Sequence, residues 1–141
     1  NLVSRPEATT ILGALKLVGH TDSGIKYGFL NAVTDEEYGS IEKEIDGETT
    51  REDFLIEPYS NYNTSVVQVP VLNDISAFKL ISNNLSRDGE TPITTSAIEG
   101  GFSFFNNTLR IGTELGTSHH SDKPDGYAYS LYLDYKNQIT N

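Results

Sequence analysis

The sequence predicts an all-β fold, an antiparallel up-and-down meander of about eight strands that forms all or part of an outer-membrane β-barrel. Three observations predict it. Hydrophobic and polar residues alternate with a period of two along most of the chain. Turn-forming Gly, Asn, Asp and Pro residues separate the alternating segments. Helical periodicity is nearly missing, and the longest apolar runs are too short for a transmembrane helix.

The clearest alternation lies between Tyr127 and Lys136. Side chains alternate across a strand, so this segment has one apolar face and one wetter face. The apolar face carries tyrosines toward both ends and leucines between them, which is the order of a strand that crosses a bilayer. Its residues are Tyr127, Tyr129, Leu131, Leu133 and Tyr135.

The other expected strands follow in order along the chain, and each is bounded by turn chemistry. Thr21 to Gly24 and Asn73–Asp74 read as short turns, and Asn106–Asn107 fits a type I′ turn because Asn tolerates a left-handed φ. We expect Gly100–Gly101 to mark a bulge or bend, and we expect a longer loop from His119 to Asp125. The expected strands cover residues 9–20, 25–33, 62–72, 75–86, 93–105, 108–118 and 126–136.

The segment from about 34 to 57 is predicted to be a protruding polar hairpin, because Asp46–Gly47 is a strong hairpin signal. A short helix capped before Asp35 is the alternative for its first part. The whole chain, residues 1–141, is expected to be one barrel domain or a barrel fragment. The chain begins without Met and ends on a turn-like stretch after Gln138, so both termini look cut.

The alternation assigns side chains to the two sides of a barrel wall. Lipid-facing positions would be uncharged, because a cation near the bilayer midplane costs about 2–4 kcal/mol. Lumen-facing charges could pair across strands. The predicted lipid-facing residues are Leu109, Ile111, Leu115, Tyr127, Tyr129, Leu131, Leu133 and Tyr135, and the predicted lumen-facing residues are Arg110, Glu114, Asp134 and Lys136.

Composition excludes several kinds of partner and chemistry. The net charge of -10 argues against a nucleic-acid partner, because no basic stripe is present. The absence of Cys excludes disulfides, thiolate metal sites and cysteine nucleophiles. The sequence contains no nucleophile elbow, phosphate loop or dinucleotide fingerprint. We therefore predict no enzyme activity, no catalytic residues, no cofactor and no metal.

Three clusters resemble binding sites, but each has a simpler explanation. His119 and His120, with Asp122 and Asp125, resemble a metal site, but adjacent strand residues point in opposite directions. The acidic residues Asp35, Glu36, Glu37, Glu42 and Glu44 lack the spacing of a calcium loop. Tyrosines could stack on sugars, although an interfacial belt or sheet packing explains them better. These tyrosines are Tyr59, Tyr62, Tyr127, Tyr129, Tyr132 and Tyr135.

Several segments together resemble the DUF5916 family. The first and most specific match is Ile11 to Thr21 with Gly24 and the run Gly28 to Thr34. The second is Glu57 to Asn63, and further matches are Phe105 to Thr108, Gly116 to Ser118 and Gly126 to Ala128. The matches stay in register over nearly all of the chain.

The resemblance implies a large bacterial envelope protein of a kind common in Bacteroidetes. Such proteins look like a carbohydrate-binding family 9-like β-sandwich followed by an outer-membrane β-barrel, and this chain resembles part of the barrel. The sandwich matches nothing here, so no sugar-binding residues transfer, and the family offers no catalytic residues. A chain of 141 residues would make an incomplete barrel.

Function is therefore predicted at the level of location and partner. The leading hypothesis is an outer-membrane barrel segment with a structural or transport-related role, in contact with membrane lipid and with other segments of a longer parent. The first alternative is a soluble carbohydrate-binding β-sandwich of the cell envelope, which would bind glycans. The second is a non-catalytic part of an envelope glycan hydrolase.

Overall fold

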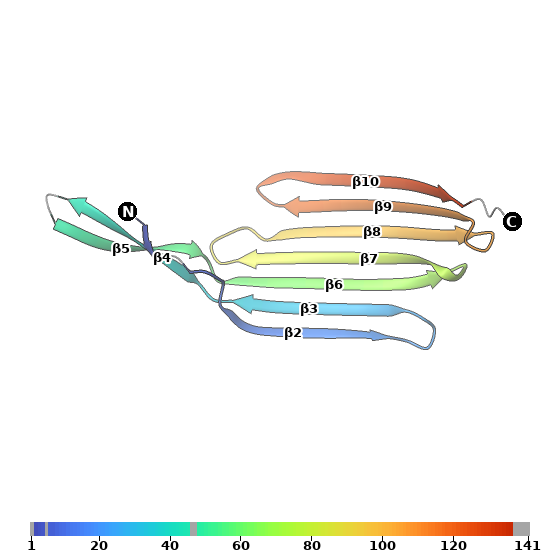
Figure 1. Ribbon diagram of the computed structural model, residues 1–141, viewed down its shortest axis with the longest axis horizontal. Helices are drawn as coiled ribbons and strands as arrows, with labels where there is room; N and C mark the ends of the chain where they lie inside the picture. Colours follow the sequence, from blue (N-terminus) through green and yellow to red (C-terminus); the bar gives the residue numbers. More distant parts are fainter. Residues whose placement is uncertain (1, 5, 46–47, 137–141) are drawn as a thin grey trace.

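The computed structural model describes residues 2–4, 6–45 and 48–136, and every regular element in them is a β-strand. Seven strands form one antiparallel sheet in the order β10-β9-β8-β7-β6-β3-β2 (Figure 1). The predicted all-β meander is confirmed, and among the described residues no helix is long and apolar enough to cross a membrane. The strands of this sheet are β2 (Ile11–His20), β3 (Lys26–Thr34), β6 (Ser60–Val71), β7 (Asn73–Arg87), β8 (Ile93–Phe104), β9 (Leu109–His120) and β10 (Lys123–Tyr135).

A second, smaller sheet has three strands, in the order β1-β4-β5. Its strands are β1 (Leu2–Ser4), β4 (Glu37–Ile45) and β5 (Glu48–Glu57). The pairing of β4 with β5 makes a hairpin that extends away from one end of the large sheet (Figure 1). Residues 37–45 therefore form a strand, Asp35 and Glu36 connect it to β3, and no capped helix forms there, whereas the predicted turn at Asp46–Gly47 lies outside the described residues.

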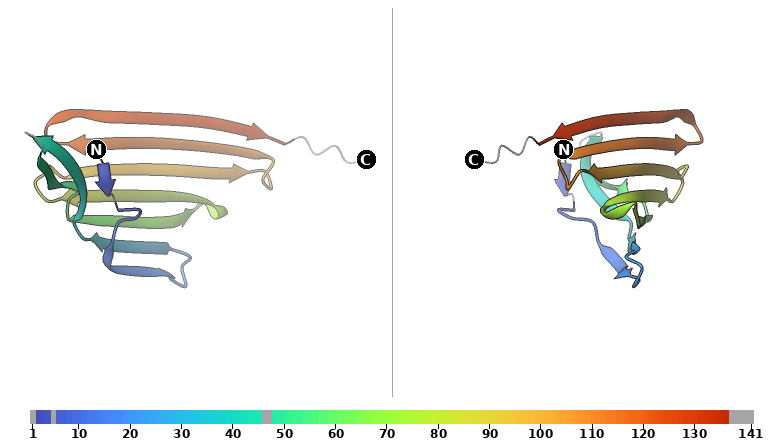
Figure 2. Two further views of the ribbon diagram at one scale, coloured as in Figure 1. Left: turned by 60° about the vertical axis from the view of Figure 1, so that its left-hand side comes forward. Right: turned by 90° about the vertical axis from the view of Figure 1, so that its right-hand side faces the viewer.

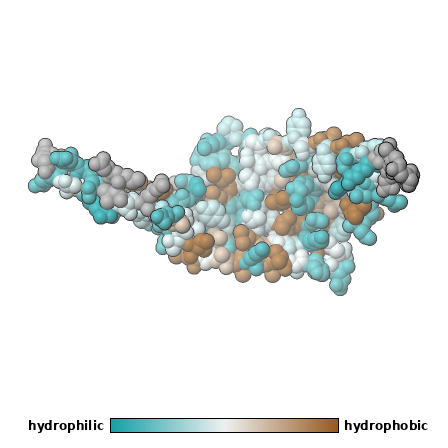
Figure 3. All heavy atoms as spheres, in the orientation of Figure 1, coloured by the Kyte–Doolittle hydropathy of each residue, from teal (hydrophilic) through white to brown (hydrophobic). Residues whose placement is uncertain are grey.

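The large sheet is a single twisted layer that does not close into a barrel, because β2 and β10 form its two edges (Figure 2). No hydrophobic side chain among the described residues is buried, and the fully buried side chains are Ser60 and Ser76. Hydrophobic burial is the main favourable term in folding, so a layer that leaves its large apolar side chains exposed lacks a packed core of its own. Hydrophilic groups dominate the hairpin in Figure 3, and both kinds mix over the sheet in that view.

The two ends of the sheet differ in their connections. At one end β2–β3, β6–β7 and β8–β9 are joined by short turns, and at the other end the chain leaves for the hairpin between β3 and β6. Apart from the hairpin, the connections at both ends have one to five residues, and the expected longer loop at 119–125 is wrong. His119 and His120 belong to β9 and Lys123 begins β10, so the connection is only Ser121 and Asp122.

Two other turns differ in detail from the prediction. The β6–β7 connection is the single residue Leu72, with a φ of 62°, in place of Asn73–Asp74. The register then shifts between Pro70 and Val71, which forms a bulge in β7. Asn106 and Asn107 both have positive φ as expected of a type I′ turn, and Phe105 joins them with a φ of 52°.

The bulge in β7 leaves the end of β8 paired with β9 but without a backbone partner in β7, and side chains of β7 supply hydrogen bonds there instead. The β7–β8 ladder ends at Ala77 and Gly101. Beyond it, the Ser103 amide donates to the Ser76 hydroxyl at 2.9 Å, and the Asn73 side-chain amide donates to the Ser103 carbonyl at 2.9 Å. Since Ser76 and Ser103 are 1% and 3% exposed, these bonds satisfy backbone groups that water does not reach.

Glycines allow rings to lie flat against the sheet. An added Cβ at Gly112 would meet the Tyr132 ring at 1.9 Å, and one at Gly19 would meet the Tyr27 ring at 2.6 Å. No bulge forms at Gly100–Gly101, because both residues are paired in register with β7 and β9, although the β7–β8 ladder ends at Gly101. Instead, Phe78 and Phe102 approach Gly100 and each other, with ring centroids 5.2 Å apart in an edge-to-face arrangement.

Candidate functional site: the two faces of the large sheet

The register of the ladders sorts every paired side chain of the large sheet onto one of two faces. Tyr129 pairs with Leu115, which pairs with Ile98, and the row continues through Leu80 and Val67. Residues at alternate positions from these share the same face. None of the paired side chains on this face is Asp, Glu, Lys or Arg. We call it the uncharged face, and the opposite one the charged face.

The uncharged face carries most of the large apolar side chains of the sheet, and they are exposed or half-buried. The β10 side chains are the most open, with Tyr129 86% and Leu131 76% exposed. All eight residues predicted as lipid-facing lie on this face. Its apolar residues are Leu15, Leu17, Tyr27, Phe29, Val33, Val67, Val69, Phe78, Leu80, Ile98, Phe102, Phe104, Leu109, Ile111, Leu115, Tyr127, Tyr129, Leu131, Leu133 and Tyr135.

The charged face carries both signs of charge. Lys79 and Glu99 form an ion pair with 2.5 Å between Nζ and Oε2, and both side chains are about one-third exposed. They line a shallow hollow together with Glu114, Ser130 and Tyr132. The charged residues in its ladders are Lys16, Lys26, Lys79, Arg87, Glu99, Arg110, Glu114, Lys123 and Asp134.

Three of the four predicted lumen-facing residues therefore share the face opposite the apolar band. Arg110 and Asp134 are direct cross-strand partners, and Glu114 lies between Glu99 and Ser130. The fourth, Lys136, follows the end of β10, and its backbone amide donates to the Thr108 carbonyl at 2.8 Å. The direct juxtaposition of Glu99 and Glu114 places like charges opposite each other, a pairing that destabilises a ladder in the absence of a counter-charge.

The apolar residues of the uncharged face form a band that is oblique to the strands. In β2 the band consists of Leu15 and Leu17, so its centre along the strand is position 16, although the Lys16 side chain itself lies on the charged face. The register connects position 16 through the intervening strands to Gly126 in β10. In β10 the centre of the band is Leu131, midway between Tyr127 and Tyr135. The centre has therefore moved along the strands between the two edges of the sheet.

The displacement is gradual. Projected along the ladders onto β10, the centre lies at Gly126 for β3, at Ser130 for β6 and β7, and at Tyr132 for β8 and β9. From β2 to β10 the centre moves about five residues along the strands, at ~3.3 Å each, while the sheet extends over six strand spacings of ~4.8 Å. These two lengths give an angle of roughly 30° between the strands and the normal to the band. Strands of membrane barrels tilt by about 35–45° from the barrel axis.

A row of amide and hydroxyl side chains borders the band at the hairpin end. The Asn31 side-chain amide donates to Asn61 Oδ1 at 2.6 Å and to Asn63 Oδ1 at 2.8 Å. In the neighbouring strands the Asn84 side-chain amide donates to the Thr94 hydroxyl at 3.0 Å. Sequence patterns do not predict this row, because its members come from four strands and meet only through the register.

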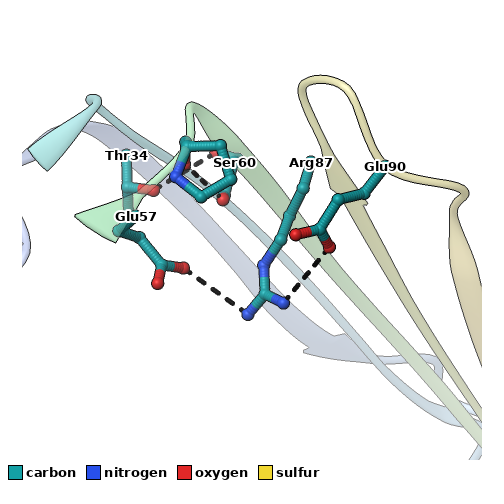
Figure 4. A network of polar contacts seen from close by, with 6 residues as sticks. Thr34, Glu57, Ser60, Arg87 and Glu90 are labelled. Atoms are coloured by element: carbon teal, nitrogen blue, oxygen red, sulfur yellow. Dashed lines mark hydrogen bonds and ion pairs between the residues drawn. The ribbon is translucent and has the colours of Figure 1, made fainter. Parts of the chain in front are cut away.

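A network of charges fastens the root of the hairpin to the large sheet. The Arg87 guanidinium at the end of β7 lies 3.5 Å from a carboxylate oxygen of Glu57 and 3.5 Å from one of Glu90 (Figure 4). Beside it the Ser60 hydroxyl donates to the Pro58 carbonyl at 2.8 Å, and the Asp88 amide donates to the Tyr59 carbonyl at 2.9 Å. These contacts join the end of β5, the start of β6, the end of β7 and the loop after it, at the point where the hairpin leaves the sheet.

On the other side of the root, Glu37 accepts the Thr10 amide at 2.6 Å. Hydrogen bonds from Thr10 hold the pKa of the Glu37 carboxyl below its ordinary value. A lowered folded-state pKa means that the contact is at full strength above the ordinary glutamate pKa of about 4.3 and is lost as the pH falls through the lowered value.

We therefore expect the amide resonance of Thr10 in NMR spectra to shift on acidification, with a midpoint below the ordinary glutamate pKa. In Glu37→Gln that transition should vanish, because the substituted amide does not titrate in this range. A transition that persists unchanged in the variant would contradict the assignment to Glu37.

The other candidate clusters do not assemble into sites. His119 and His120 lie on opposite faces, since they pair with Thr94 and Ile93. His119 Nδ1 is 2.7 Å from Asp125, and His120 Nδ1 accepts the Asp122 amide at 3.2 Å. In the acidic segment, the Tyr38 hydroxyl donates to Glu36 at 2.6 Å. Among the described residues, no group of three or more His, Asp or Glu side chains is placed to hold a metal ion.

Comparison with known families gives one match. The model of DUF5916, a domain of unknown function, matches residues 1–139. The chain belongs to the DUF5916 family. No curated protein and no solved structure matches it. The family resemblance predicted from the motifs is thus confirmed over almost the whole DUF5916 chain, and its function has to be argued from the two faces.

Proposed function

We propose that this DUF5916 chain is a membrane-embedded wall segment of a bacterial outer-membrane β-barrel, with a structural or transport-related role and no catalytic one. In this proposal the uncharged face contacts lipid and the charged face lines the interior. The hairpin of β4 and β5 then stands in water beyond one end of the barrel. The oblique apolar band on a face without charge is the observation that carries the proposal.

Three physical arguments support a membrane setting. Hydrocarbon replaces the missing second layer, because the described residues place no apolar layer over the exposed leucines and tyrosines of the uncharged face. The strands of the large sheet have 9 to 15 residues, long enough for tilted membrane strands of about 9–11 residues. The apolar stretch from Tyr127 to Tyr135 spans about 27 Å along the strand, near the ~25 Å height of a barrel's apolar band once the tilt is included.

The distribution of side chains supports the orientation of the wall. Tyr127 and Tyr129 at one border of the band and Tyr135 at the other stand where amphipathic rings favour an interface. The hydrogen-bonded amide row of Asn31 and Asn63 lies at the border nearest the hairpin. Mixed charges on the opposite face suit a water-filled or plugged interior, where they cost little.

The natural absence of tryptophan allows a direct test. Single tryptophans are introduced at neighbouring positions with opposite orientation, Leu131→Trp on the uncharged face and Ser130→Trp on the charged face. The protein is reconstituted into phosphatidylcholine vesicles with and without bromine on the acyl chains. We expect strong quenching of the Leu131→Trp fluorescence by brominated lipid and little quenching of Ser130→Trp.

Depth adds a second criterion. Quenching by bromine near the bilayer centre should be strongest for Leu131→Trp and weaker for Tyr127→Trp and Tyr135→Trp at the borders of the band. Equal quenching at positions 130 and 131, or none at either position in a chain that stays monomeric without detergent, would refute the membrane-wall proposal and favour a water-soluble role.

A further inference from the structure

Over most of their length, the two edges of the large sheet lack the features by which edge strands avoid pairing; the register shifts and Pro124 lie near the ends of the edge strands. Natural edges are blunted by proline, bulges, charges or short length. From Gly126 to Tyr135, β10 contains no proline and no register shift, and its single charge, Asp134, lies on the charged face. In β2 the register shifts only between Ile11 and Gly13, and Lys16 is the single charge.

The edge amides of β10 can be assigned a direction. The Lys136 amide donates to the Thr108 carbonyl of the β8–β9 turn, so it points toward β9. Backbone groups alternate in direction along a strand, so the amides of Leu131, Leu133 and Tyr135 point away from β9 toward the open side. A membrane would leave such groups unsatisfied at a cost of several kcal/mol each, which a paired strand removes.

The number of strands limits which strand can pair there. Each of the six neighbouring pairs in the sheet is antiparallel, so β2 and β10 run in the same direction. They therefore cannot pair with each other in an antiparallel ladder. The same holds for β10 of one copy and β2 of a second copy, if both copies have the same orientation in the membrane. An antiparallel closure requires an odd number of added strands.

We infer that β2 and β10 are docking edges for antiparallel amphipathic β-strands, odd in total number, whose uncharged side chains extend the uncharged face. This inference rests on the proposed membrane role. The displacement of the apolar band along the strands predicts the register of the added strands. Beside β10, the apolar residues of the added strand lie opposite Leu131, Leu133 and Tyr135. Beside β2 they lie opposite Gly13 and Leu15. One added strand gives eight, the smallest even number that bacterial outer-membrane barrels use.

Site-specific photocrosslinking in the whole polypeptide, as its gene encodes it and in its own membrane, tests the inference. A benzophenone amino acid replaces Ser130 at the β10 edge or Lys16 at the β2 edge, both on the charged face and away from lipid. The matched control replaces Thr95 in β8, which has Asn83 and Ser118 as its cross-strand neighbours. Crosslinked peptides are identified by mass spectrometry.

We expect positions 130 and 16 to capture segments outside this sheet that alternate uncharged and polar residues, and position 95 to capture only β7 and β9. Moving the reactive group from Ser130 to Ala128 should shift the captured residue by two in the opposite chain direction, as an antiparallel ladder requires. Capture of β2 from position 130, capture of β10 in a second copy, or no captured polypeptide at either edge would overturn the inference. The tryptophan quenching above reports lipid contact separately, so a failure of the docking inference can be distinguished from a failure of the membrane-wall proposal.

Discussion

Leu131→Arg is expected to destabilise the membrane-inserted protein by about 2–4 kcal/mol, because it places a cation at the centre of the apolar band near the bilayer midplane. The measurement is the free energy of unfolding from denaturant titration in lipid vesicles. Leu131 is 76% exposed in the chain alone. On a soluble surface the same substitution would stay within about 0.5 kcal/mol, so the size of the effect separates the two settings.

The matched control for this prediction is Ser130→Arg, one residue away on the charged face. Its side chain would lie near Glu114, the cross-strand partner of Ser130, so we expect a small effect of either sign. If the two variants unfold with equal free energies, the assignment of the uncharged face to lipid is wrong. A large loss in Ser130→Arg alone would mean that the faces are reversed.

Ser76→Ala is expected to cost about 1–3 kcal/mol, because it removes the acceptor of the buried Ser103 amide. No strand replaces it, since the β7–β8 ladder ends two residues earlier in β8, at Gly101. The measurement is again the free energy of unfolding, and amide hydrogen exchange at Ser103 should become faster in the variant. The exposed Ser130→Ala serves as the control for the loss of a hydroxyl.

A change at Ser76 no larger than that at Ser130 would show that water or a shifted backbone satisfies the Ser103 amide. Ser76→Thr offers a second comparison, because it retains a hydroxyl in a buried position. If Ser76→Thr keeps the slow exchange at Ser103 and Ser76→Ala loses it, the hydroxyl and not the volume of the side chain is responsible.

Sequence patterns found the hairpin and most strands but misplaced several boundaries. The segment at 119–125 reads as a loop because it is polar and contains a proline, yet β9 and β10 continue through most of it, leaving only Ser121 and Asp122 between them. The Thr91 hydroxyl reaches Asp122 from the neighbouring β7–β8 loop, and the His119–Asp125 contact bridges the two strands. Such contacts favour an ordered turn, and neither can be read from local composition.

Period-two alternation by itself determined that this chain forms two-sided strands and which side chains share a face, because successive side chains in a strand must point in opposite directions. Only the tertiary structure decided the oblique course of the apolar band, the amide row beside it and the common direction of the two edge strands. These depend on register and strand order, which are set by turn lengths and bulges such as the one after Pro70. If a turn or a bulge were one residue longer or shorter, different residues would face each other on neighbouring strands, while the alternation within each strand would stay the same.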